Sequence, residues 1–189
     1  DGIGHKQAEL VTTWAQERMK NARVIANNPL MVKCAKIIKE DKDYADIVQY
    51  LEVVKDEYGY KGVLVSNDKG LVTVSTAEEG VGNDISQMDY FNQALQGSTF
   101  VSNVFPSEIP LTNEMGEKEL GMPTMFVSTP LKDRDGVIIG VVAIRVDEKT
   151  LNDLMLSLHL GKTGETYLIN KDGYMITESR FAAHLKEMG

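Results

Sequence analysis

Residues 62–76 read GVLVSNDKGLVTVST, and this stretch decides the fold of the chain. Two apolar, β-branched runs flank a turn of Asn, Asp, Lys and Gly, which predicts an antiparallel hairpin. Residues 164–178, GETYLINKDGYMITE, repeat the plan, with Gly173 at the place of Gly70. A recurrence of this kind indicates two copies of one fold. Because little chain follows the second copy, we expect one whole module and the opening of another.

The composition is that of a globular protein with a real core, at 42% hydrophobic and 25% charged residues. The formal net charge of −8 weighs against nucleic acid as a partner, since phosphate backbones need clustered Lys and Arg. No apolar run approaches the ~18–20 residues that span a bilayer, and no signal peptide is present. The chain remains compatible with the soluble part of a membrane protein. Cys34, the single cysteine, is expected to be a small buried hydrophobe.

The first third of the chain is expected to be helical. Residues 5–27 carry apolar side chains at spacings of three and four, which is typical of one helical stripe. Pro29 limits this helix, because the residue before a proline disfavours the helical region. Two further helices are predicted at 29–40 and 43–58.

After residue 58 the pattern changes to strands joined mostly by hairpins. The expected strands are 62–66, 71–75, 99–103, 124–133 and 136–147. A short helix over 84–97 is predicted to begin at an N-cap Asp84 or Ser86, and 103–123 is expected to be a long structureless loop. Few helices separate the strands, so we predict an α+β fold with a five-stranded antiparallel sheet and the helices on one side.

This order resembles the double Cache sensor modules, which are PAS-like folds outside the membrane in bacterial and archaeal receptors. The resemblance covers nearly the whole chain. Besides the long N-terminal helix, three stretches carry it: GNDISQMDYFNQAL (82–95), FVSTPLKDRDGVIIGVVAIRVDEKTL (126–151) and GKTGETYLINKDGYMITESRF (161–181).

The resemblance implies a domain plan and a location. It divides the chain into a helical region at 1–58, a membrane-distal sensing module at 59–147, a connecting helix at 148–160 and the start of a membrane-proximal module at 161–189. The parent protein would be a membrane-anchored receptor with this segment outside the cytoplasm. Its output would be a sensor histidine kinase or, as second choice, a methyl-accepting chemotaxis receptor.

Some members of the family hold amino acids through an Arg and two aromatics in the segment matching 88–91 and through an Asp near the end of the last strand. Here these positions hold Met88, Tyr90, Phe91 and Arg145. The resemblance therefore implies a carboxylate or another anion in place of an amino acid, since a guanidinium pairs planar anions and repels ammonium.

Strand alternation singles out Arg145 independently, because it places this charge at the end of the apolar row 137–143. The alternative is an ion pair with Asp147 or Glu148. Each of the other candidates has a structural alternative too. Tyr90 could be a core residue, Met88 a gap-filler and Phe105 a loop anchor, and the hydroxyls of Ser128 and Thr129 could bond to nearby backbone. The candidate ligand contacts are Arg145, Tyr90, Met88, Phe105, Ser128 and Thr129.

Three functions are open. The first is a ligand-sensing domain that binds a small anionic or polar metabolite and has no chemistry, metal or cofactor of its own. The second is a ligand-free spacer that forms a homodimer through the helix at 5–27. The third, a cytoplasmic PAS-like domain with haem or flavin, ranks last because no His lies in a strand region. The three histidines are too scattered for a metal site, and no nucleotide-binding or hydrolase motif occurs.

Overall fold

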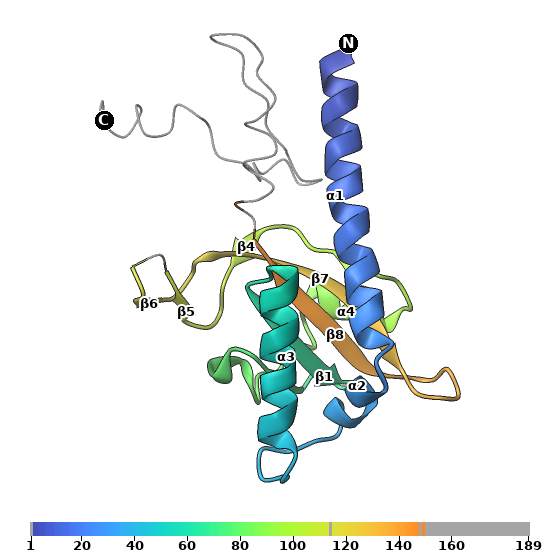
Figure 1. Cartoon of the computed structure of the whole chain (residues 1–189), viewed down its shortest axis with the longest axis vertical. Coiled ribbons are helices and arrows are strands. Elements are labelled where there is room, and N and C mark those ends of the chain that lie inside the picture. The colour runs from blue at the N-terminus through green and yellow to red at the C-terminus, as the bar shows by residue number, and fades with distance from the viewer. Residues whose placement is uncertain (1, 114, 148, 150–189) are drawn as a thin grey trace. The chain divides into compact units, whose positions relative to one another are not determined.

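The computed structural model describes residues 2–113, 115–147 and 149 (Figure 1). The chain divides into two compact units, Glu17–Asp147 and Asp1–Gln16 with Glu148–Gly189. The sheet belongs to the first unit, and residues 2–16 of the long N-terminal helix belong to the second. The predicted second module, 161–189, lies outside the described residues, as does the connecting helix except for Lys149.

Three helices precede the sheet, as predicted: α1 (Gly2–Ala26), α2 (Pro29–Cys34) and α3 (Tyr44–Tyr58). The side chain of Asn28 caps α2 by accepting from the Leu30 N–H at 3.0 Å. The prediction that this helix reaches residue 40 is wrong. It ends at Cys34, whose carbonyl oxygen accepts a hydrogen bond of 2.6 Å from the Thr73 hydroxyl on a strand.

The main sheet is antiparallel throughout and follows the order β2-β1-β8-β7-β3. Its strands are β1 (Gly62–Asn67), β2 (Val72–Ser75), β3 (Phe100–Val101), β7 (Pro123–Lys132) and β8 (Ile138–Val146). These are the five predicted strands, and the α+β class is confirmed. A sixth strand in the described part of the chain, β4 (Phe105–Pro106), pairs with the start of β7.

The segment predicted as a structureless loop therefore has structure. Besides β4 it contains β5 (Leu111–Thr112) and β6 (Lys118–Glu119), which pair as a separate hairpin. The prediction missed them because strands of two residues carry no period that a sequence pattern can reveal.

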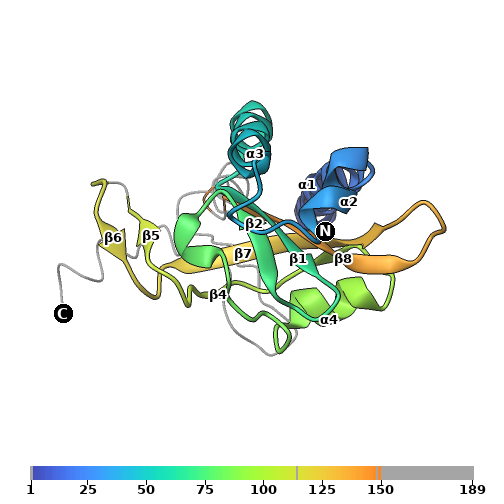
Figure 2. The same cartoon turned by 90° about the horizontal axis from the view of Figure 1, so that it is seen from below.

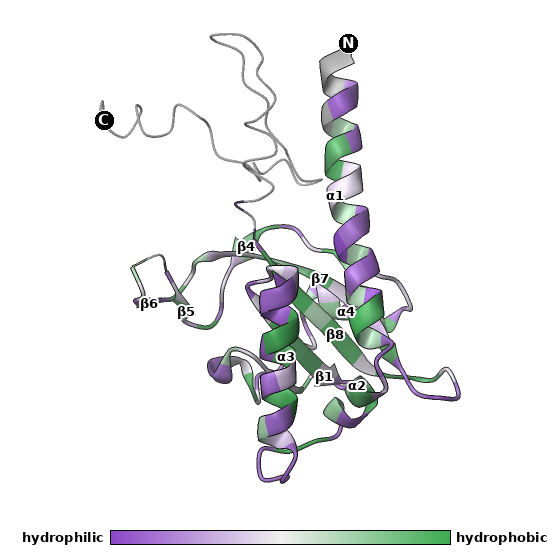
Figure 3. Ribbon diagram, in the orientation of Figure 1, coloured by the Kyte–Doolittle hydropathy of each residue, from purple (hydrophilic) through white to green (hydrophobic). Residues whose placement is uncertain are grey.

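Helices cover both faces of the sheet, which corrects the expectation that they lie on one side. The end of α1 from Glu17 onward lies on one face with α2 and α3, and α4 (Asp89–Leu95) lies on the other (Figure 2). On the α4 face, Val141 and Ala143 of β8 pack in one cluster with Phe91 and Ala94. Alternation turns Val142, Ile144 and Val146 toward the other helices. Strands β1 and β8 are accordingly apolar along most of their length (Figure 3).

Helix α4 begins later than the sequence predicts. Its N-cap is Met88, without a side-chain cap bond, and neither Asp84 nor Ser86 caps it. The backbone of the preceding segment is instead paired with the β1–β2 turn, since Ile85 N donates to the Gly70 carbonyl at 2.8 Å. The Asp84 carboxylate accepts from the Ser86 N–H at 2.8 Å and closes a local turn.

Candidate ligand-binding site

A cavity of about 80 Å³ lies on the α4 face of the sheet. It is bounded by β1, β7 and β8, by the segment that follows β2, and by the start of the 103–123 segment. Its charged and polar lining residues include Arg145, Asp84, Glu108, Asn83, Ser75, Thr76, Ser107 and Thr124, and its large apolar ones include Tyr90, Phe105, Phe126, Met88, Leu64, Ile85, Ile109 and Leu111.

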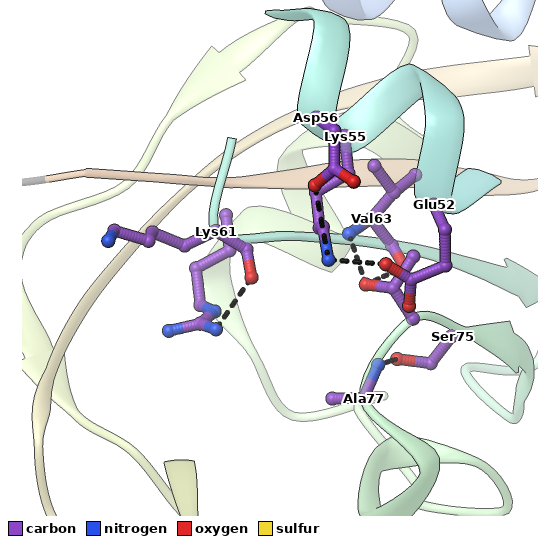
Figure 4. A network of polar contacts seen from close by, with 9 residues as sticks. Glu52, Lys55, Asp56, Lys61, Val63, Ser75 and Ala77 are labelled. Carbon is purple, nitrogen blue, oxygen red and sulfur yellow. Dashed lines mark hydrogen bonds and ion pairs between the residues drawn. The ribbon is translucent and has the colours of Figure 1, made fainter. Parts of the chain in front are cut away.

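Arg145 lines this cavity from β8. In the register of the sheet it lies opposite Gly62 of β1 on one side and Phe126 of β7 on the other. Its Nη2 donates to the Lys61 carbonyl oxygen at 2.7 Å, the dashed contact beside Lys61 in Figure 4. The Asp147 carboxylate, one of the acids considered as its partner, lies 3.9 Å from Lys61 Nζ. A half-buried guanidinium is thus held to the backbone at the edge of the cavity.

Three aromatic rings form the wall beside Arg145. The Tyr90 ring is stacked on Phe126 with centroids 4.7 Å apart, and Phe105 lies 6.1 Å from each of them. Tyr90 is 3% exposed, and this burial, with the nearby Glu108 charge as second cause, raises the pKa of its phenol. The wall is therefore uncharged and flat, and it suits the apolar part of a small ligand.

The hydroxyl-bearing residues that edge the cavity mostly bond to their own loops. Ser75 Oγ accepts from the Ala77 N–H at 3.0 Å, and Thr76 Oγ1 accepts from the Val63 N–H at the same distance (Figure 4). Ser107 Oγ donates to the Ile109 carbonyl oxygen at 2.7 Å. These bonds fix the shape of the edge.

The segment after β4 covers the cavity and is tied down at its far end. Leu111 of β5 is 4% exposed and contributes to the lining. In the paired strand β6, Lys118 Nζ lies 2.9 Å from Glu79 Oε1 in the short 3₁₀ helix η1 (Glu78–Gly80). The Lys118 side chain lowers the pKa of Glu79. One ion pair thereby joins the covering hairpin to the opposite edge of the cavity.

The structure brings four of the six predicted contacts together: Arg145, Tyr90, Met88 and Phe105 all line the cavity. Ser128 and Thr129 do not, which corrects their placement. The Ser128 hydroxyl donates to the Tyr90 carbonyl oxygen at 2.7 Å, and Thr129 Oγ1 lies 2.9 Å from Thr99 Oγ1. Both hydroxyls are used inside the protein, Ser128 with a backbone carbonyl, as the alternative supposed, and Thr129 with another side chain.

Sequence reasoning missed Phe126, Glu108 and Thr124. Phe126 could have been predicted from the sequence, since alternation along β7 puts it on the same face as Ser128. Alternation along β7 places Thr124 on this face too. Glu108 reaches the cavity through the path of the 103–123 segment, for which the sequence contains no signal.

Within the described residues, no group of three or more His, Cys, Asp or Glu side chains is placed to hold a metal ion. The helices in that part of the chain include none with the length and apolar character of a bilayer span.

Comparison with known proteins places this architecture in a family. Residues 3–187 match the family model dCache_1, described as a Cache domain. The chain belongs to the Cache domain family. The resemblance drawn from the sequence is thereby confirmed. No curated protein matches this Cache domain by sequence.

Solved structures share the fold of this Cache domain at low identity. The ligand-binding domain of the Pseudomonas aeruginosa PAO1 amino acid chemoreceptor PctB, in complex with L-Arg, is 16% identical with a TM-score of 0.68, over 94% of this chain and 68% of that one. The ligand-binding domain of the Campylobacter jejuni chemoreceptor Tlp3, in complex with 4-methylisoleucine, is 16% identical with a TM-score of 0.67, over 93% and 66%. This Cache domain thus spans about two thirds of the length of these domains.

The E. coli DcuS sensor domain is a third similar structure, 18% identical with a TM-score of 0.57. That match covers 82% of this chain and 99% of the DcuS domain.

Proposed function

We propose that this Cache domain binds a small carboxylate in the cavity between Arg145 and the aromatic wall. The observation that carries the proposal is the position of Arg145, a guanidinium held at the edge of a small cavity. Arg pairs carboxylates through parallel N–H donors, and such charge-assisted bonds are stronger than neutral ones. The remainder of the ligand would lie against Tyr90 and Phe126.

The size and lining of the cavity limit the ligand. At about 80 Å³ the cavity accepts an acid of a few carbon atoms, not a large side chain. Its acidic residues, Asp84 and Glu108, are exposed at the edge, so they oppose anions with several charges. A monocarboxylate satisfies both conditions.

The domain would act as the sensor of a membrane-anchored receptor, located outside the cytoplasm, with no chemistry of its own. Family membership supports this role. The ligand would shift the domain toward a state with the covering segment closed, by as much as its affinities for the two states differ. Among the similar proteins, PctB and Tlp3 are chemoreceptors; a histidine kinase remains our first expectation for the output, with a chemoreceptor second.

Thermal melting of the purified domain against a panel of carboxylates tests the proposal. A binding acid stabilises the fold by RT ln(1 + [L]/Kd), about 2.7 kcal/mol at a hundredfold excess over Kd. Arg145→Gln should weaken binding at least about tenfold, because the neutral and shorter amide forms no charge-assisted pair.

Arg134→Gln is the matched control. Arg134 is exposed in the β7–β8 turn and does not line the cavity, so its loss changes the net charge equally and should leave binding unchanged. The proposal fails if no acid shifts the wild-type melting temperature, or if both variants weaken binding to the same extent. The alternative would then be the ligand-free module that pairs through α1, and sedimentation of the domain would reveal its dimer.

A further inference from the structure

Thr124 differs from the other serine and threonine residues that line the cavity. It is 2% exposed, and its Oγ1 is enclosed without a hydrogen-bond partner among the residues that the structure describes. Ser75, Thr76 and Ser107, by contrast, all bond to backbone groups. A buried hydroxyl without a partner destabilises a protein, because it has lost its hydrogen bonds to water and has formed none inside the protein.

Two aromatic residues are neighbours of Thr124 in the sheet. It pairs with Phe105 across β4 and β7, and Phe126 follows two residues later on the same face. The two rings have centroids 6.1 Å apart. An ordered water at such a position needs two to four polar partners, which rings do not supply. A ligand that brings its own oxygen satisfies the hydroxyl better.

Thr124 and Arg145 lie on one wall of the cavity. Phe126 is directly opposite Arg145 in the register, so Thr124 is the diagonal neighbour of Arg145. Diagonal neighbours across two strands are about 7–8 Å apart at the backbone, a span that one small acid bridges. Thr124 lines the cavity, and a step of about 120° in χ1 moves its Oγ1 to another staggered position without movement of the strand.

We propose that Thr124 is the second ligand contact, and that it selects acids with a further oxygen, a hydroxyl or keto group, over plain carboxylates. This inference rests on the proposed function. Arg145 would hold the carboxylate, the aromatic wall would hold the carbon atoms, and Thr124 Oγ1 would bond to the additional oxygen. A site built to pair such a group discriminates against the analogue that lacks it, because the protein hydroxyl then stays unpaired.

The test compares acids that differ by one oxygen. L-lactate and pyruvate are titrated against propionate by calorimetry, with the wild type, Thr124→Val and Thr124→Ser. The wild type should bind lactate or pyruvate at least about tenfold more tightly than propionate. Thr124→Val should remove this preference while leaving the propionate Kd within about threefold, and Thr124→Ser should retain it.

The melting temperature of each unliganded variant separates a ligand contact from a structural hydroxyl. Because Val has the shape of Thr and no polar atom, Thr124→Val should melt at or above the wild-type temperature. A drop of several degrees with loss of all three acids would show a structural role and overturn the inference. Equal binding of lactate, pyruvate and propionate by the wild type would also overturn the inference, but it would not contradict the proposed carboxylate site. If none of the acids binds and none in the wider panel does, the proposed function itself has failed.

Discussion

Gly62 and Arg145 are cross-strand partners in which the absence of one side chain makes room for the other. They are paired in the β1–β8 register. A Cβ added at Gly62 would lie 3.4 Å from Arg145 Nε and 3.6 Å from Arg145 Cβ. The guanidinium therefore occupies the space above β1, and this places it at the edge of the cavity.

Enlarging residue 62 should displace Arg145 without unfolding the domain. Gly62→Ala adds only ordinary contacts, so we expect wild-type carboxylate binding, whereas Gly62→Val should weaken binding at least about tenfold by pushing the guanidinium away. Calorimetric titration of both variants measures this difference. Wild-type affinity in Gly62→Val would mean that the position of Arg145 over β1 does not matter for binding.

Ser128 should prove structural. Its hydroxyl is fully buried and holds the Tyr90 carbonyl of α4 to β7. We expect Ser128→Ala to lower the free energy of unfolding by about 1–2 kcal/mol, the usual range for a lost buried hydrogen bond, in urea denaturation. The preference for lactate over propionate should persist. Loss of that preference with unchanged stability would show instead that Ser128 contacts the ligand.

Gly140 should tolerate no side chain. An added Cβ would lie 2.0 Å from the Ser66 carbonyl oxygen, a contact with backbone that cannot move aside. We expect Gly140→Ala to destabilise the domain by about 2–4 kcal/mol in urea denaturation. Gly62→Ala, on the paired strand, is the control and should cost less than about 1 kcal/mol. Similar stabilities for the two variants would contradict the close approach of β1 and β8.

Cys34 should make stability fall at alkaline pH. Burial raises the pKa of its thiol from 9.0 to about 11, so above about pH 9 the unfolded chain loses a proton that the native state keeps. The contribution of the Cys34 thiol to the free energy of unfolding is fully present below pH 9 and is lost as the pH rises toward 11. Urea denaturation from about pH 8 to about pH 10.5 should show a steeper decline for the wild type than for Cys34→Ala. Equal slopes would show a thiol with an ordinary pKa.

Much of the fold was predictable because it depends on local rules. The apolar, β-branched run GVVAIRV and the turn residues of DRDG specify the β7–β8 hairpin, and the position of Arg145 on the α4 face follows from counting along one strand. The start of α4 was not predictable in this way. Asp84 and Ser86 have good capping chemistry, but a hydrogen bond to the distant Gly70 carbonyl decides the conformation there.

Thr124 and Ser128 show most clearly where sequence reasoning ends. Both are hydroxyl residues of β7, on the same face and four positions apart, and alternation alone treats them alike. By itself the sequence determined the five strands of the main sheet, their antiparallel class and the charge at the end of β8, because these follow from local pattern, and its resemblance to a known family indicated the family. Only the tertiary structure decided which hydroxyl has a hydrogen-bond partner among the described residues. A carbonyl oxygen of α4 comes within 2.7 Å of Ser128, while aromatic rings flank Thr124, and such encounters depend on how distant segments pack.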